Sequence, residues 1–243
     1  MSNEKIALIT GAHKGIGFET ARQLAKTGVH VLLGSRDRKK GVDAALKLQA
    51  EGLPVEALSI DVNSAGSIAE AVREVERKHG RLDILINNAG VLLDDYAKKP
   101  SEQGIEVWRT TFDTNLFGLI ETTLAFLPLL KKSPAGRIVN LSSILGSNAL
   151  HSDPSFGIYN FKMPAYNVSK SAVNAWTVQL AWELKDSRIK VNAAHPGHVK
   201  TDLGGEAAPM ELVDGAKTSV QLALIGPDGP TGSYQHQGQT LPW

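Results

Sequence analysis

The sequence KIALITGAHKGIG, residues 5–17, carries the strongest indication of architecture in this chain. Its first half is a short apolar run typical of a buried strand, and its second half contains Gly11, Gly15 and Gly17. Residues 18–26, which follow, have a helical pattern that ends before a further glycine. A strand, a glycine turn and a helix in this order begin a βαβ unit, so we expect a parallel sheet covered by helices.

Strand-like and helical segments alternate through the rest of the chain. Further strands are expected at 29–35, 55–60, 82–86, 137–141, 189–194 and 233–241, and further helices at 39–50, 67–79, 101–115, 119–131, 164–185 and 211–223. Nearly continuous apolar strands are typical of parallel sheets that are buried on both faces. The alternation predicts one α/β domain over residues 1–243, doubly wound and Rossmann-type, with a mostly parallel sheet of about seven strands.

The composition argues against several classes of protein. Among the 243 residues, 26 Lys and Arg nearly balance 25 Asp and Glu, so no basic surface for nucleic acid or membrane is indicated. The first residues are polar and lead directly into the first strand, unlike a signal peptide or a membrane span. Cysteine is absent, which excludes disulfides and thiolate metal ligands. We therefore expect a soluble cytoplasmic protein whose partners are neither nucleic acid nor membrane.

The glycine turn predicts a binding site for a dinucleotide. Gly11 allows a sharp turn, Gly15 lets a phosphate approach the backbone, and Gly17 lets the helix pack closely on the strand. The helix that begins there presents free N–H groups and the positive end of its dipole to a pyrophosphate. Because the spacing G-x-x-x-G-x-G differs from the commoner G-x-G-x-x-G, an ordinary glycine turn is the alternative.

The residues after the second strand bear on which nicotinamide cofactor would bind. An acidic residue there would bind the ribose 2′-hydroxyl, whereas cations would bind a 2′-phosphate. Arg36 follows the strand, and Lys14 lies in the glycine loop beside the same pocket. These two cations favour NADP(H), since Arg can bind a phosphate through two parallel hydrogen bonds. Asp37, one residue later, leaves NAD(H) open, and a solvated charged loop is the alternative for the whole run.

A second chemical pattern lies in the helix expected at 164–185. Tyr166 and Lys170 are four residues apart, so their side chains share one face of the helix. An apolar stripe continues that face, which places the pair toward the core. A nearby cation favours the phenolate, so Lys170 is expected to lower the pKa of Tyr166 and make its proton easier to donate. The pattern Y-x-x-x-K is common by chance and gains weight only from its context.

Six motifs in register resemble those of the short-chain dehydrogenase/reductase family. They are Thr10-Gly11-x-x-x-Gly15-x-Gly17, Asn87-Asn88-Ala89-Gly90, Asn115, Ser142-Ser143, Tyr166-x-x-x-Lys170 and Pro196-Gly197. The resemblance spans almost the whole chain and implies hydride transfer with a nicotinamide cofactor. The glycine loop, Arg36, the long segment before Tyr166 and the C-terminal Trp243 are similar to the NADPH-dependent carbonyl reductase branch.

The resemblance implies a role for each motif residue. Tyr166 would be the general acid that protonates the carbonyl oxygen, and Lys170 would lower the phenol pKa and hold the nicotinamide ribose. Ser143 would orient and polarise the carbonyl, and Asn115 would hold a proton-relay water near Lys170. The residues implied in cofactor binding are Gly11, His13, Lys14, Gly15, Ile16, Gly17, Arg36, Asp61, Val62, Asn88, Ala89, Gly90, Tyr166, Lys170, Pro196, Gly197, Val199 and Thr201.

Purely structural roles are the alternative for several of these residues. Asn87 and Asn115 can bond backbone groups at strand or helix ends, and the Ser pair can simply end a strand. Asp61 can cap the helix that follows it. His151 and His198 have no second His or carboxylate at ligand spacing, so we expect no metal site.

Two segments near these motifs are expected to form the substrate pocket. Residues 144–163 are longer than in most of the family and would form a lip, and residues 200–215 would form a lid. The aromatic and apolar side chains of the lip favour a hydrophobic or ring-bearing substrate, with a small satellite core as the alternative. Trp176 looks exposed on the long helix; it marks a subunit contact or packs on the chain's own loop, so monomer and homodimer both stay open.

The sequence therefore predicts an NADPH-dependent oxidoreductase that reduces an aldehyde, ketone or quinone to an alcohol with a Tyr general acid. The expected partner is a small-molecule carbonyl or alcohol. An NAD-dependent alcohol dehydrogenase working oxidatively is one alternative, because hydride transfer is reversible. A catalytically silent dinucleotide sensor is another, although a sensor has no need of a complete reacting centre. An epimerase or dehydratase fits less well, because little chain follows Pro196 for a sugar-nucleotide domain.

Overall fold

The computed structural model describes residues 4–243 and shows a central sheet of eight strands. The strands are β1 (Ile6–Ile9), β2 (His30–Ser35), β3 (Val55–Ser59), β4 (Ile84–Asn87), β5 (Arg137–Leu141), β6 (Lys190–Ala194), β7 (Ser233–His236) and β8 (Gln239–Thr240). Their order in the sheet is β3-β2-β1-β4-β5-β6-β7-β8, and only β8 is antiparallel to its neighbour. The predicted doubly wound, mostly parallel fold is confirmed, with one short strand more than expected.

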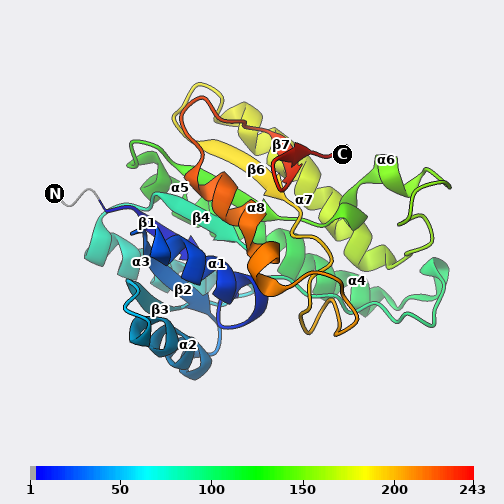
Figure 1. Cartoon of the computed structure of the whole chain (residues 1–243), viewed down its shortest axis with the longest axis horizontal. Helices are drawn as coiled ribbons and strands as arrows, with labels where there is room; N and C mark the ends of the chain where they lie inside the picture. The colour runs from blue at the N-terminus through cyan, green and yellow to red at the C-terminus, as the bar shows by residue number, and fades with distance from the viewer. Residues whose placement is uncertain (1–3) are drawn as a thin grey trace.

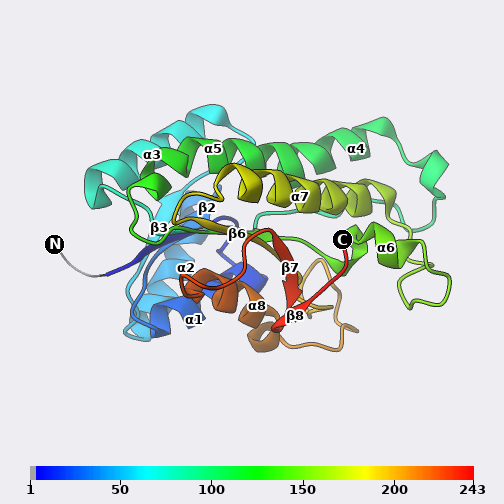
Figure 2. The same ribbon diagram turned by 90° about the horizontal axis from the view of Figure 1, so that it is seen from above.

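Helices cover both faces of this sheet. They are α1 (Gly15–Lys26), α2 (Arg38–Ala50), α3 (Ala65–His79), α4 (Ile105–Phe112), α5 (Gly118–Lys131), α6 (Asn148–His151), α7 (Pro164–Glu183) and α8 (Leu212–Leu224). Figure 1 shows the strands between the helical layers, and Figure 2 shows α3, α4, α5 and α7 on one face and α1, α2 and α8 on the other. Within residues 4–243, no helix has the length and apolar character needed to cross a membrane.

The core consists of two apolar layers, one on each face of the sheet. Because successive residues of a strand point to opposite faces, Leu32 enters the layer under α3 and α5, and Leu33 enters the layer under α1 and α8. Phe126 and Leu24 are fully buried helix residues of the two layers. Complete burial of one such side chain contributes about 1.5–3 kcal/mol to the stability of the fold. The two layers therefore fix the strands, and the loops at their ends, relative to the helices.

The structure corrects the expected helix at 101–115. A 3₁₀ turn covers Pro100–Glu102, α4 begins only at Ile105, and a π-helical turn over Asp113–Phe117 joins α4 to α5 without a break. At Gly118 the backbone passes very close to the segment after β3, since a Cβ there would lie 2.6 Å from the Val62 carbonyl oxygen. Neither the π turn nor this contact follows from hydrophobic periodicity.

Trp176 is half-buried and packs against the core layer of α3, α5 and α7, so its expected exposure is wrong. Trp182, further along the same helix, is the exposed indole, with 68% of its surface accessible. Helical spacing places the two rings on different sides of α7. Monomer and homodimer both remain predictions.

Candidate active site

The glycine loop lies at the carboxyl ends of β1 and β4, where the strand order reverses. Gly11 and Gly15 adopt positive φ angles of 63° and 59°, which favour glycine. A Cβ on Gly11 would lie 3.0 Å from the Ala89 Cα, and one on Gly17 would lie 2.5 Å from Asn88 Nδ2. Open parallel sheets bind ligands in the crevice at such a switch point.

Asn88 fastens the glycine loop to the end of β4. Its Nδ2 donates to the carbonyl oxygens of Thr10 at 2.8 Å and Gly11 at 3.1 Å, and its backbone N–H donates to Thr10 Oγ1. Asn87 lies one layer deeper, where its Nδ2 donates to Asn140 Oδ1 at 2.9 Å. Both side chains are therefore structural anchors, and Asn88 also faces the crevice.

The residues of the loop fit a bound dinucleotide. Helix α1 begins without a capping side chain among the described residues, and its first turn contains no acidic residue. Its first backbone N–H groups thus remain available to an anion, and the helix dipole favours a negative charge there. His13 Nδ1 is also buried and has no hydrogen-bond partner within residues 4–243. It is a further polar atom that a bound ligand could contact.

Three cations lie near His13, in the region where the sequence predicts a ribose 2′-phosphate. Burial lowers the pKa of His13, and the nearby charges of Lys14, Lys40 and Arg36 lower it further. Asp37 instead caps α2, since its Oδ1 accepts a hydrogen bond from the Lys40 backbone N–H at 3.0 Å. The acidic residue that left NAD(H) open is thus engaged in the helix, and Lys40 is a cation that the sequence analysis missed.

Tyr166 is 6% exposed at the start of α7. Burial raises the pKa of its phenol to about 12, and the nearby Ser143 hydroxyl opposes this rise. The structure thus brings the phenol and the Ser143 hydroxyl together, as the motifs predict. At neutral pH the phenol keeps its proton, which is the state that a general acid requires.

Lys170 lies beneath Tyr166 on the same helix. Its Nζ donates to the Leu141 carbonyl oxygen at 2.8 Å and lies 5.7 Å from the centroid of the Tyr166 ring. Burial lowers the pKa of Lys170 to about 8. The expected lowering of the Tyr166 pKa by Lys170 is not seen, because burial dominates both groups and the ammonium is directed at a backbone carbonyl.

Asn115 is fully buried in the π-helical turn. Its Oδ1 accepts from the Val91 N–H at 2.8 Å, and its Nδ2 donates to the Val91 carbonyl oxygen at 2.9 Å and to Ser169 Oγ at 3.0 Å. The side chain therefore joins the segment after Gly90 to α7, close to Lys170. This is the backbone-bonding alternative, and it leaves the side chain no spare donor for a water.

Comparison with known protein families identifies the family of this chain. The model of the short chain dehydrogenase family matches residues 5–212. This chain is a member of the short-chain dehydrogenase/reductase family. Carbonyl reductase (NADPH) 1 of Mus musculus is 34% identical to this family member over 280 aligned residues, which cover 100% of this chain and 99% of that protein.

Solved structures of other family members have the same fold. Carbonyl reductase Sniffer of D. melanogaster superposes with a TM-score of 0.84 at 29% identity, over 99% of each chain. Salutaridine reductase from Papaver somniferum superposes with a TM-score of 0.83 at 27% identity, over 96% of this chain and 100% of the other. The resemblance to the family, and to its carbonyl reductase branch, is confirmed.

Asp94 is a site residue of this short-chain dehydrogenase/reductase that the sequence analysis missed. Its buried carboxylate accepts hydrogen bonds from the backbone N–H groups of Ala165 at 2.8 Å and Tyr166 at 3.0 Å. Pro164 begins α7, and the preceding Met163 supplies no capping side chain. Asp94 therefore caps the helix from a distant loop and fixes the backbone of Tyr166. No local sequence pattern connects the two segments.

His195 is a second missed residue, directly before the Pro196-Gly197 motif. Its Nδ1 accepts from the Ile144 N–H at 3.1 Å, next to Ser143. Burial lowers the pKa of His195 to about 3, and the neighbouring His236 contributes to the shift. The ring stays neutral at physiological pH and keeps its acceptor lone pair, so it holds the loop that carries Ser143.

Two further residues predicted to bind cofactor, Asp61 and Gly197, make structural contacts. Ser64, not Asp61, caps α3; the Asp61 carboxylate instead accepts from the Asn63 N–H at 3.0 Å. The hypothesis that Asp61 caps this helix is therefore wrong. Gly197 has a φ of 96°, and a Cβ there would lie 2.6 Å from Met210 Sδ, so this turn packs against the expected lid.

The expected lid at 200–215 faces the glycine loop. Residues 200–211 are irregular, and α8 begins at Leu212. Lys14 Nζ forms an ion pair with Asp202 Oδ2 at 2.5 Å, and the Gly15 Cβ position lies 3.7 Å from Thr201 Cγ2. One of the cations expected to bind cofactor is thus paired with the lid across the crevice.

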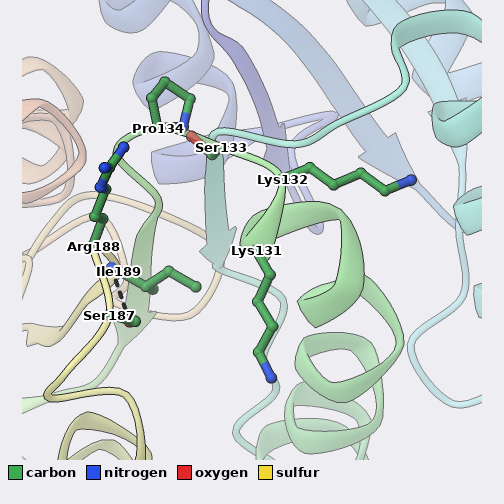
Figure 3. Close-up of a pocket in the computed structure, with 7 residues that line it drawn as sticks. All are labelled: Lys131, Lys132, Ser133, Pro134, Ser187, Arg188 and Ile189. Atoms are coloured by element: carbon green, nitrogen blue, oxygen red, sulfur yellow. Dashed lines mark hydrogen bonds between the residues drawn. The ribbon is translucent and has the colours of Figure 1, made fainter.

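The lip at 144–163 borders a cavity of about 360 Å³ near the start of α7. Its lining comes from residues 96–100 and 160–163, and it includes Tyr96, Phe161 and Met163. Met163 of the lining directly precedes α7, so the cavity lies near the start of the helix that carries Tyr166. A second cavity of about 380 Å³ lies at the opposite end of the sheet, where the charged ends of Lys131, Lys132 and Arg188 diverge (Figure 3).

The C-terminal tail fastens the lip to the sheet. Ala149 N–H donates to the Trp243 carbonyl oxygen at 3.0 Å, and Ser147 Oγ donates to the Pro242 carbonyl oxygen at 2.8 Å. The Trp243 ring stacks on Tyr234 of β7, with centroids 5.5 Å apart. Figure 2 shows the C-terminus next to α6. The C-terminal Trp thus supports the first part of the lip.

Proposed function

We propose that this protein is an NADPH-dependent carbonyl reductase in which Tyr166 donates the proton. The observation that carries the proposal is the buried phenol of Tyr166, which lies beside the Ser143 hydroxyl and above Lys170 at the edge of the crevice. A buried, protonated phenol next to a second hydroxyl is an arrangement suited to receiving a carbonyl oxygen.

NADP(H) is the cofactor that the residues fit. The uncapped N-terminus of α1 would hold the pyrophosphate, and Arg36, Lys40 and Lys14 would bind the 2′-phosphate around His13. The similar mouse protein is named for NADPH, which supports the same choice. When bound, this cofactor supplies the hydride that reduces the carbonyl carbon.

Side chains of the protein would polarise and protonate the carbonyl oxygen of the substrate. Ser143 Oγ would donate a hydrogen bond to the substrate carbonyl and so polarise it, and Tyr166 would transfer its phenolic proton to the oxygen as negative charge develops there. Lys170, held by the Leu141 carbonyl, would bind the nicotinamide ribose. Asn115 would keep the segment after Gly90 and α7 at a fixed separation.

The cavity of about 360 Å³ favours a ring-bearing or hydrophobic carbonyl substrate. Its volume suits a small organic molecule, and Tyr96, Phe161 and Met163 supply apolar and aromatic surface. Three lysines also line the cavity, namely Lys98, Lys99 and Lys162. Aromatic aldehydes, quinones and cyclic ketones are therefore the first compounds to test.

Turnover measurements test the proposal directly. Oxidation of NADPH and of NADH is followed by absorbance with each compound class, and kcat/KM is compared for the two cofactors. We expect turnover with at least one ring-bearing carbonyl and a higher kcat/KM with NADPH. A higher value with NADH would overturn the cofactor assignment, and cofactor binding without turnover of any carbonyl would favour a sensor.

A further inference from the structure

His30, Glu56 and His79 form a cluster at the end of the sheet opposite to the active site. His30 is the first residue of β2, Glu56 is the second residue of β3, and His79 is the last residue of α3. Each offers one ligand atom, and the three atoms lie within 4.8 Å of one another. We propose that these three side chains bind a divalent transition-metal ion, with zinc as the best match.

Regular secondary structure brings the three side chains together. His30 and Glu56 share a face of the sheet with Leu32 and Leu58, which pack under α3. His79 closes the cluster from the end of that helix, where the C-terminal end of the dipole favours a cation. Ligands on two paired strands and a packed helix are held more precisely than ligands on loops.

The distances suit one small ion. His79 Nε2 lies 2.8 Å from Glu56 Oε1, a hydrogen bond that metal binding would replace, and His30 Nε2 lies 3.5 Å from the same oxygen. Donor atoms around one tetrahedral zinc ion lie roughly 3.3 Å apart, since Zn–N and Zn–O bonds are about 2.0–2.1 Å long. Small rotations of the three side chains would therefore be enough to complete the site.

The protein alone leaves the cluster incompletely paired. Both histidine side chains are partly buried. His30 Nε2 is fully buried and has no hydrogen-bond partner among residues 4–243. The two imidazole rings lie 5.3 Å apart between centroids. A buried polar atom without a partner carries a free-energy cost, and a metal ion would remove it by accepting the lone pair.

Two charged neighbours bear on the affinity. Lys78 Nζ contacts Glu56 Oε2 at 3.2 Å, and it also pairs with Glu74 at 2.8 Å. It therefore occupies the carboxylate oxygen that the histidines do not contact, and it can keep Glu74 as its partner when an ion binds. Two histidines and one carboxylate leave a fourth position for water, and imidazole ligands favour zinc over magnesium.

Calorimetric titration of zinc chloride into the full chain tests the site. We expect one equivalent to bind to the wild-type protein, and a matched magnesium titration to give no binding. Mutation of a residue that only hydrogen-bonds to a metal ligand weakens metal binding roughly 10- to 100-fold. Glu56→Gln and His79→Gln each remove a ligand, so each should weaken zinc binding by more than this. Lys78→Met, which removes a neighbouring charge but no ligand, is the matched control and should bind at least as tightly.

Thermal unfolding without metal provides the folding check for each variant. At a zinc concentration about a hundredfold above the wild-type Kd, the Tm of the wild type should rise by roughly 5–10 °C, while those of Glu56→Gln and His79→Gln should rise by less than about half as much. Absence of zinc binding by the wild type, or equal binding by a correctly folded His79→Gln variant, would overturn the proposal. So would equal losses in Lys78→Met and the ligand variants.

Discussion

At the scale of single residues, the candidate site depends on side chains that hold the reacting groups as well as on those groups themselves. The motifs correctly place Ser143, Tyr166 and Lys170 in one region of the fold. They do not predict the direction of the Tyr166 pKa shift, because that direction depends on burial and on where the Lys170 ammonium points. Neither follows from the spacing of two residues on a helix.

Asp94 provides a residue-scale prediction. Asp94→Ala removes the acceptor of the Ala165 and Tyr166 N–H groups, so it should lower the free energy of unfolding by about 1–2 kcal/mol. The free Tyr166 backbone should also lower kcat more than it raises the KM for NADPH. Urea unfolding and steady-state kinetics measure the two effects.

Asp94→Asn is the control for that change. An Asn side chain can still accept a hydrogen bond at the start of a helix, so this variant should recover part of both losses. Equal kcat values for Asp94→Ala and the wild type would show that Asp94 does not position Tyr166.

At the scale of elements, periodicity predicts the layers of the fold well. The expected strands and helices on each side of the glycine loop are found, since apolar runs and amphipathic stripes directly reflect burial. The π turn at Asp113–Phe117 was missed, because a turn with a different hydrogen-bond step breaks no hydrophobic pattern. The contact between Lys14 and Asp202 was also missed, since it joins a loop to the lid across the crevice.

That contact leads to an element-scale prediction. Lys14 cannot pair fully with Asp202 and with a 2′-phosphate at once, so Asp202→Asn should lower the Kd for NADPH by up to about fivefold at low salt. The Kd for NADH, which has no 2′-phosphate, should change little. Fluorescence titrations with both cofactors measure these values.

Asp228→Asn is the matched control, because it changes the net charge equally in an exposed turn after α8. The effect of Asp202→Asn should shrink as salt screens the exposed pair. Equal changes in the two variants, or an equal change for NADH, would contradict the account.

At the scale of the whole molecule, the sequence alone does not show which residues far apart in the chain are in contact. Asp94 reaches α7, and His30, Glu56 and His79 converge from three elements, only because the sheet order sets strands side by side. These contacts depend on register and on loop paths, so no local pattern predicts them. The same packing buries Lys170, and a buried amine affects the stability of the entire fold.

The pH dependence of stability is the prediction at this scale. The pKa of Lys170 falls from 10.5 to about 8 in the folded protein, so unfolding takes up a proton between these values and the contribution of Lys170 to stability improves as pH rises. Relative to Lys170→Met, the wild type should gain about 3 kcal/mol of unfolding free energy between pH 7 and pH 10.5. Urea unfolding of both proteins across this range measures the gain, and a constant difference would contradict it.

The central claim is that the Tyr166 phenol delivers the proton to the carbonyl oxygen, and single-turnover reduction by Tyr166→Phe tests it most directly. Tyr234→Phe is the control, since it removes a second fully buried phenol hydroxyl and leaves the ring in place. With NADPH binding unchanged in both variants, Tyr166→Phe should lose roughly 10²- to 10⁴-fold in rate and Tyr234→Phe should keep the wild-type rate. An undiminished rate in Tyr166→Phe would contradict the account.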